Sequence, residues 1–230
     1  MLRLFDVPAL FQGFDVVFST ISLVLILAVT LYAYRVYKLS SERRHLYFVS
    51  ALGLVVLSQC VKLFMNSVLY FHSFRDITAS VMDPVVDVLP SVNLLYRLVY
   101  FVHFVLLLGA WSMIFFLSQP SRNRLDNMYE IIQLGVFASF LAMLSLVATY
   151  TFAVYALSAL IMLAGASINY RKQFLNHGTG TGLGRSVLIL CCAHAVYALV
   201  PYAHMLYVPA ELLMFTAYTS LYLTFKRVVK

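Results

Sequence analysis

The chain has 230 residues, of which 63% are hydrophobic and only 11% are charged, and its mean hydropathy is +0.89. A soluble domain carries about 25% charged residues, so a chain this apolar would expose far more hydrophobic surface than one core can hide. The composition excludes a soluble globular protein and predicts one multi-pass domain in the cell membrane, surrounded by the lipid bilayer. The net charge of +7 does not indicate nucleic acid, because the basic residues stand at the ends of apolar segments, where they orient a membrane protein and meet anionic headgroups.

Apolar segments long enough to cross a bilayer recur along the whole chain. A crossing needs about 20 mostly apolar residues. Seven crossings are predicted, at residues 15–37, 45–71, 94–117, 128–148, 151–170, 186–205 and 209–225. The long stretch from Met128 to Tyr170 has basic residues beyond both ends, so it is expected to cross twice and to turn near residues 149–151. The fold class predicted is an all-α membrane protein, a seven-transmembrane-helix bundle.

Positive charge predicts the orientation of this bundle. Cytoplasmic loops of membrane proteins carry an excess of lysine and arginine. Twelve of the sixteen basic residues fall on one predicted side: Arg35, Lys38, Arg43, Arg44, Arg122, Arg124, Arg171, Lys172, Arg185, Lys226, Arg227 and Lys230. That side is expected to be cytoplasmic, with the N-terminus outside and the C-terminus inside. Residues 173–185 hold four spaced glycines without the lysine of a phosphate-binding loop, and are expected to form a flexible cytoplasmic loop.

The joint between the first two predicted helices carries a resemblance. It reads Tyr34-Arg35-Val36-Tyr37-Lys38-Leu39-Ser40, then Arg43-Arg44 and Leu46-Tyr47-Phe48. This pattern resembles that of small, uncharacterised archaeal seven-helix membrane proteins, some of which resemble membrane sensor modules. The topology is also that of opsins and G-protein-coupled receptors. However, the last predicted helix, Pro209–Phe225, has no lysine to form the Schiff base of a retinal protein.

Charged and polar residues inside the predicted spans are the candidates for function. On insertion scales a charge at the centre of a span costs about 2.5–3.5 kcal/mol, so such residues are retained for a reason. Gln59, Lys62 and Asn66 follow the spacing of one helix face. The predicted ligand-binding residues, most of them in the outer half, are Lys62, Asn66, Arg97, Tyr100, His103, His194 and Glu211.

Two interpretations of these residues stay open. In the first, Glu211 pairs with Lys62 or Arg97 and only holds helices together, because buried ions are usually paired. In the second, the residues line a pocket that opens outward. Its excess positive charge would favour an anionic ligand, unless an aspartate folds in; the candidates are Asp15, Asp83 and Asp87.

Cysteines and histidines also gather near the predicted midplane. They are Cys60, His103, Cys191, Cys192 and His194. Cys191 and His194 are one turn apart and could share a metal, and His103 with His194 could hold haem. Their neighbours offer almost no polar groups to orient a ligated metal, so the cluster is predicted to be packing, with no metal and no cofactor.

The sequence contains no zinc-protease or serine-hydrolase motif, and the chain is predicted not to be an enzyme. The function that the pattern favours is a non-enzymatic receptor-like or sensor-like protein. It would bind a small or lipid-borne ligand in its outer half and signal through a protein partner or a second copy of itself. The alternatives are a scaffolding membrane subunit of a larger complex and a small transporter.

Overall fold

The structure is a computed structural model, and it describes residues 11, 13–70, 92–119, 135, 137, 143, 151–177 and 181–228. Within these residues the protein is helical and contains no strand. The α-helices are α1 (Phe14–Ser40), α2 (Arg43–Tyr70), α4 (Val92–Ser118), α6 (Thr151–His177), α7 (Thr181–Leu199) and α8 (Tyr207–Val228), and η3 (His204–Leu206) is a short 3-10 helix. The all-helical prediction is thus confirmed over the described part of the chain.

Several of these helices suit a membrane. The stretches Phe14–Ser40, Arg43–Ser67, Val99–Ser118 and Gly182–Leu199 are each long and apolar enough to cross one. This supports the prediction of a membrane protein with more than one crossing. The predicted fourth span, residues 128–148, lies outside the described residues apart from three helical positions, as do Asp83 and Asp87 in the segment before α4.

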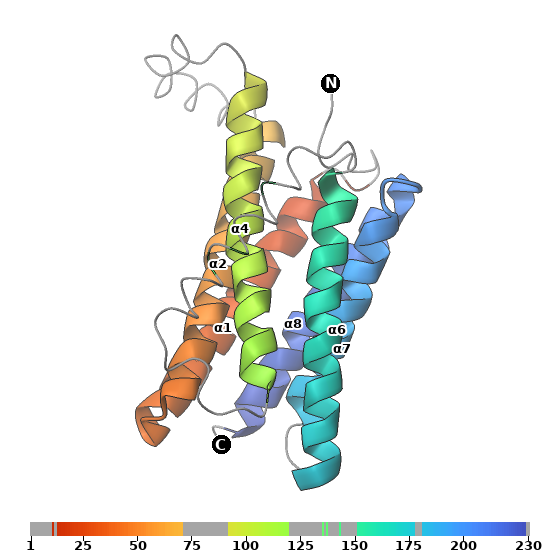
Figure 1. Cartoon of the computed structure of the whole chain (residues 1–230). Coiled ribbons are helices and arrows are strands. Elements are labelled where there is room, and N and C mark those ends of the chain that lie inside the picture. Colours follow the sequence, from red (N-terminus) through yellow and green to blue (C-terminus); the bar gives the residue numbers. More distant parts are fainter. Residues whose placement is uncertain are drawn as a thin grey trace.

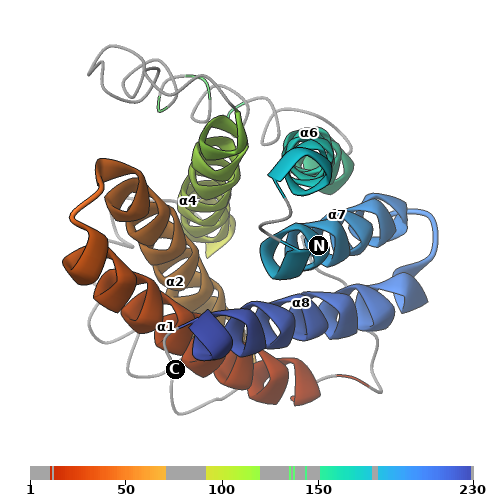
Figure 2. The same ribbon diagram turned by 90° about the horizontal axis from the view of Figure 1, so that it is seen from below.

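The helices form a closed ring (Figures 1 and 2). Each described helix packs against the next one along the chain, from α1 through α2, α4, α6 and α7 to α8, and α8 packs against α1. Figure 2 shows this ring in a view along the bundle, with α1 and α8 side by side. Because the ring closes, each helix turns one face toward a shared interior.

Local chemistry explains where α1 begins and ends. At its start, the Asp15 carboxylate Oδ1 accepts hydrogen bonds from the backbone N–H groups of Gly13 and Val16, at 3.1 and 2.9 Å. Such a carboxylate satisfies N–H groups that have no partner inside the helix. At the other end, Ser41 adopts the left-handed conformation (φ 53°) and donates its N–H to the Tyr37 carbonyl at 2.8 Å. This closing turn makes α1 and α2 antiparallel neighbours.

Two sequence predictions about α6 and α7 were wrong. Residues 173–185 are not one long loop, because α6 continues to His177 and α7 begins at Thr181. The sixth helix was also expected to reach residue 205, but α7 ends at Leu199. Pro201 explains this end, since proline has no N–H and disfavours the helical conformation of the residue before it.

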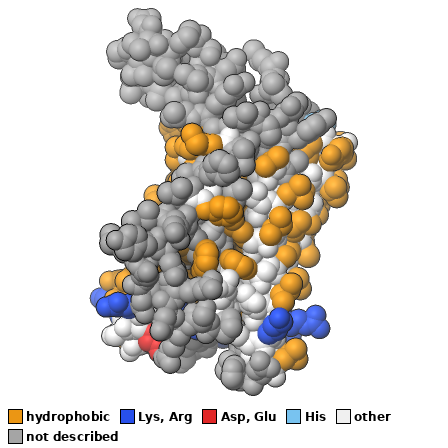
Figure 3. Space-filling model, in the orientation of Figure 1, with side chains coloured by type: hydrophobic (Ala, Val, Ile, Leu, Met, Phe, Trp, Pro, Cys, Tyr) orange, Lys and Arg blue, Asp and Glu red, His pale blue; other side chains and the backbone are white. Residues whose placement is uncertain are grey.

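The exposed positive charge lies at one end of the ring, which we call the basic end. Here α1, α4, α6 and α8 finish and α2 and α7 begin, and Figure 3 shows lysine and arginine side chains at the lower end of the face in view. Every described lysine and arginine side chain except Lys62 is exposed near this end: Arg35, Lys38, Arg43, Arg44, Arg171, Lys172, Arg185, Lys226 and Arg227. The Arg44 side chain donates to the Leu117 carbonyl at 2.5 Å, which ties α2 to the last turn of α4.

Candidate functional site: a buried ion pair and its polar partners

A buried ion pair joins α2 to α8. The Lys62 ammonium donates to Glu211 Oε1, and both side chains are less than a tenth exposed. The Tyr197 hydroxyl from α7 donates to the same Oε1 at 2.5 Å. The Tyr207 hydroxyl also bonds the Glu211 carboxylate, and the Lys62 ammonium lies 5.9 Å from the centre of the Tyr207 ring. The carboxylate therefore has three donors, which offset the cost of burying it.

A second carboxylate lies in the same part of the bundle. Asp15 has no exposed surface, and the Asn66 side chain donates to its Oδ2 at 3.2 Å. Asn66 is one helical turn beyond Lys62 on α2, so the two carboxylates are held by neighbouring positions of one helix face. We call Asp15, Gln59, Lys62, Asn66, Tyr197, Tyr207, Glu211 and Tyr218 the polar cluster.

Asp15 changes the expected charge of the site. The sequence suggested an excess of positive charge unless an aspartate folded in, and Asp15 does fold in. The described part of the site therefore holds two carboxylates and one ammonium, that of Lys62. The expectation of an anionic ligand loses its basis, because an anion would be repelled by both.

The polar face of α2 is confirmed. Gln59, Lys62 and Asn66 are each less than a tenth exposed. Besides the two contacts above, Gln59 donates from its side-chain amide to the Tyr218 hydroxyl on α8 at 3.3 Å. The three residues of this face of α2 thus bond to α1 or α8. The polar cluster connects α1, α2, α7 and α8 in the part of the bundle opposite the basic end.

Six of the seven predicted ligand-binding residues are buried. They are Lys62, Asn66, Tyr100, His103, His194 and Glu211, whereas the Arg97 side chain lies outside the described residues. The prediction that Lys62 and Glu211 face the interior is therefore confirmed. The pairing of Glu211 with Lys62, the first of the two interpretations, is what the structure shows.

The hydrogen bonds of the two histidines go to groups outside the ion pair, although the His194 ring packs edge-on against Tyr197 of the polar cluster at 6.0 Å. His103 bonds through Nδ1 to the Ser58 hydroxyl at 2.8 Å and to the Ser58 carbonyl at 2.9 Å. His194 bonds through Nδ1 to the Leu190 carbonyl of its own helix at 2.9 Å, and the Trp111 indole packs edge-on against its ring. Each imidazole therefore has a backbone acceptor for its Nδ1 proton.

The midplane cysteines do not converge with the histidines. Cys60 and Cys192 are exposed on the outside of the bundle and Cys191 is partly buried, whereas both histidines face the interior. Over the described residues no group of three or more metal-ligating side chains comes together.

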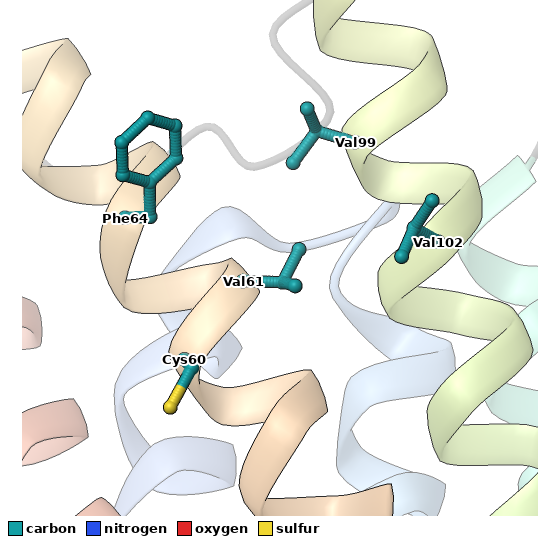
Figure 4. Close-up of a pocket in the computed structure, with 5 residues that line it drawn as sticks. All are labelled: Cys60, Val61, Phe64, Val99 and Val102. Carbon is teal, nitrogen blue, oxygen red and sulfur yellow. The ribbon is translucent and has the colours of Figure 1, made fainter.

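A separate groove lies on the outside of the bundle, between α2 and α4 (Figure 4). It has a volume of about 340 Å³, and its lining is entirely apolar: Cys60, Val61, Phe64, Val99 and Val102. None of the predicted ligand-binding residues contributes to it. Its lining offers no hydrogen-bonding or charged group to orient a ligand, so the groove and the polar cluster are different features.

Comparison of the chain with family models, with curated proteins and with solved structures finds no match in any of the three. The resemblance to archaeal seven-helix proteins therefore stays a prediction, and the polar cluster is the feature that bears on function.

Proposed function

We propose that the chain is a non-enzymatic, receptor-like or sensor-like seven-helix membrane protein in which the polar cluster receives a small or lipid-borne ligand. The observation that carries this proposal is the ion pair between Lys62 and Glu211, buried among helices of membrane length. A buried ion pair adds little net stability, because the cost of removing both charges from water offsets their attraction. Its retention inside an apolar bundle favours a functional role.

The orientation completes this proposal. The basic end would face the cytoplasm, because lysine and arginine concentrate on the cytoplasmic side of membrane proteins. Residues 128–148 would supply the seventh helix, the N-terminus would lie outside and the C-terminus inside. The polar cluster would then occupy the outer half, and the exposed basic residues would meet a cytoplasmic or membrane partner, or a second copy of the chain.

The two helices that share the ion pair offer a route for the signal. α2 begins at the basic end with Arg43 and Arg44, and α8 finishes there with Lys226 and Arg227. A ligand that forms a hydrogen bond to Lys62 or Glu211 in place of one of their present partners would weaken the contact between α2 and α8. Because helices are stiff, the change would move the ends of α2 and α8 that lie at the basic end. The coupling free energy between ligand binding and this movement would be set by the difference in ligand affinity between the two arrangements of α2 and α8.

The test measures this coupling directly. In a variant without native cysteines, spin labels are placed at Leu46→Cys and Leu223→Cys, two exposed positions near the basic ends of α2 and α8. Glu211→Gln keeps the shape of the side chain and removes its charge. We expect it to shift the distance distribution between the labels in lipid nanodiscs. Leu212→Ala, on the exposed side of the same turn, is the matched control and should leave the distribution unchanged.

A scaffolding subunit is the second candidate, because the Glu211 carboxylate already has three donors and needs no ligand to satisfy it. In a scaffold the ion pair would only stabilise the fold. Glu211→Gln would then lower the unfolding temperature without changing the distance between the labels, and that result would reject the sensor.

A further inference from the structure

One buried hydroxyl on α1 has no hydrogen-bond partner among the residues that the structure describes. Ser19, on α1, is 2% exposed, and its Oγ bonds to no atom in the described part of the protein. Two other hydroxyls on α1 and α2 bond to a carbonyl of their own helix, Thr20 to Val16 at 2.7 Å and Ser67 to Leu63 at 2.9 Å. Buried polar groups almost always have a partner, and the described residues supply none for this hydroxyl.

The pairing of α1 with α2 places Ser19 level with Lys62. The two helices are antiparallel and meet at the contact between Asp15 and Asn66. One helical turn toward the basic end advances α1 to Ser19 and brings α2 back to Lys62. An ammonium has three N–H donors, and the bond to Glu211 uses one of them. A hydroxyl without a partner and an ammonium with further donors therefore lie at the same depth.

We propose that Ser19 and Lys62 together hold an uncharged oxygen atom. It belongs to a water molecule, or to a hydroxyl, ester or amide group of a small or lipid-borne ligand. The oxygen accepts from the Lys62 ammonium and bonds to the Ser19 hydroxyl. It is uncharged because Glu211 already neutralises Lys62 and the buried Asp15 carboxylate, one turn away, repels an anion. This inference rests on the proposed function and assigns the chemical class of its ligand.

The surroundings of Ser19 suit a source in the lipid. The preceding residue, Phe18, packs edge-on against Phe215 of α8 with ring centres 5.9 Å apart, and stacks on Phe11 at 5.7 Å. These rings close the contact between α1 and α8 beside Ser19, and both Phe18 and Phe215 are only partly buried. A lipid that reached Ser19 between α1 and α8 would pass these two partly buried rings.

Thermal unfolding in nanodiscs tests the site and distinguishes the two sources. The probe is 1,2-dioleoylglycerol, a neutral lipid with a free hydroxyl and ester carbonyls, added to phosphatidylcholine. Ser19→Ala removes the proposed ligand contact. Ser67→Ala is the matched control, because that hydroxyl bonds to its own helix at a similar depth.

If the ligand is a lipid, diacylglycerol raises the unfolding temperature of the natural protein and of Ser67→Ala, and not that of Ser19→Ala. If it is water, diacylglycerol has no effect and Ser19→Ala alone lowers the unfolding temperature, by about 2–4 °C for the loss of one hydrogen bond in a chain of this size.

The inference is overturned if Ser19→Ala unfolds at the same or a higher temperature in plain nanodiscs and diacylglycerol has no effect, because an unpartnered buried hydroxyl destabilises a fold. It is also overturned if diacylglycerol acts equally on Ser19→Ala. The spin-label experiment does not depend on Ser19, so a failure of this inference can be told apart from a failure of the proposed function.

Discussion

Two sides of the ring hold together by different means. On the side of α1, α2 and α8, which we call the polar seam, helices are joined by Asp15 with Asn66 and Lys62 with Glu211. On the side of α4, α6 and α7, which we call the packed seam, the hydrogen bonds between α4 and α6 come from neutral side chains, such as the bond from Asn169 to Ser118 at 3.1 Å. Aromatic side chains are buried here beside many small and aliphatic ones. The small and aliphatic residues include Ala156, Ala159, Leu163, Ala166, Leu190 and Ala193.

The difference follows from the apolar surroundings of these helices. Lipid chains are as apolar as leucine, so hydrophobicity alone gives helices little reason to associate. Close packing of small residues and hydrogen bonds between helices both supply the missing attraction. The packed seam depends on close packing and on hydrogen bonds between neutral groups. The polar seam depends on charged and hydrogen-bonding partners, which a ligand can exchange, so a signal is expected to arise there.

The largest expected effect comes from leaving Lys62 unpaired. Glu211→Leu removes the carboxylate and leaves a buried ammonium, which should lower the free energy of unfolding by about 3–5 kcal/mol. Lys62→Met together with Glu211→Leu should recover most of this loss, because no buried charge remains. It should not recover all of it, since the hydroxyls of Tyr197 and Tyr207 lose their acceptor. The unfolding free energies of the natural protein, the two single variants and the double variant, measured in detergent micelles, give the interaction free energy between Lys62 and Glu211. Additive effects of the two substitutions would contradict the polar seam as described.

The packed seam should respond to size instead of charge. Ala159→Leu adds bulk to a position with no exposed surface and should cost about 1–3 kcal/mol of unfolding free energy. Ile161→Ala removes a large side chain from the exposed face of the same helix, where Ile161 is 72% exposed. This control should stay within about 0.5 kcal/mol in the same unfolding assay. A tolerated Ala159→Leu would mean that the interior beside α6 is not closely packed, and the comparison of the two seams would fail.

The sequence allowed part of this site to be predicted. The shared face of Gln59, Lys62 and Asn66 follows from the helical period alone, because the period is a local property of one helix. The partner of each residue depends on how helices pair, which no single segment encodes. The sequence therefore left open whether Lys62 or Arg97 meets Glu211, and whether Asp15 folds in.

Tyrosines and glycines were misread for a related reason. Tyr197 and Tyr207 were not among the predicted ligand-binding residues, although both hydroxyls bond to Glu211. Tyr207 stands one turn before Glu211 on the same helix, a spacing that could have indicated the contact. Gly182 was assigned to a flexible loop but lies in α7, where an added Cβ would come within 2.5 Å of the Thr224 side chain. Here glycine permits close packing of α7 against α8.

The smallest expected effect lies at the edge of the polar cluster. Tyr218→Phe removes the hydroxyl that accepts from the Gln59 amide at 3.3 Å, the longest of the hydrogen bonds between α2 and α8. Hydrogen bonds between membrane helices contribute about 0.6 kcal/mol on average, so a loss near this value is expected in the unfolding assay. Tyr197→Phe should cost more, because its 2.5 Å bond goes to a charged carboxylate.

The expected order of these two costs, with Tyr197→Phe more destabilising than Tyr218→Phe, sharpens the comparison between the seams. If it holds, the strength of the polar seam is concentrated at Glu211 and falls off within one or two helical turns, so a ligand must act near that carboxylate to move α8. If Tyr218→Phe costs as much as Glu211→Leu, the hydrogen bonds of the polar cluster act as one cooperative network. A ligand bound anywhere along it, including beside Ser19, could then release α2 from α8.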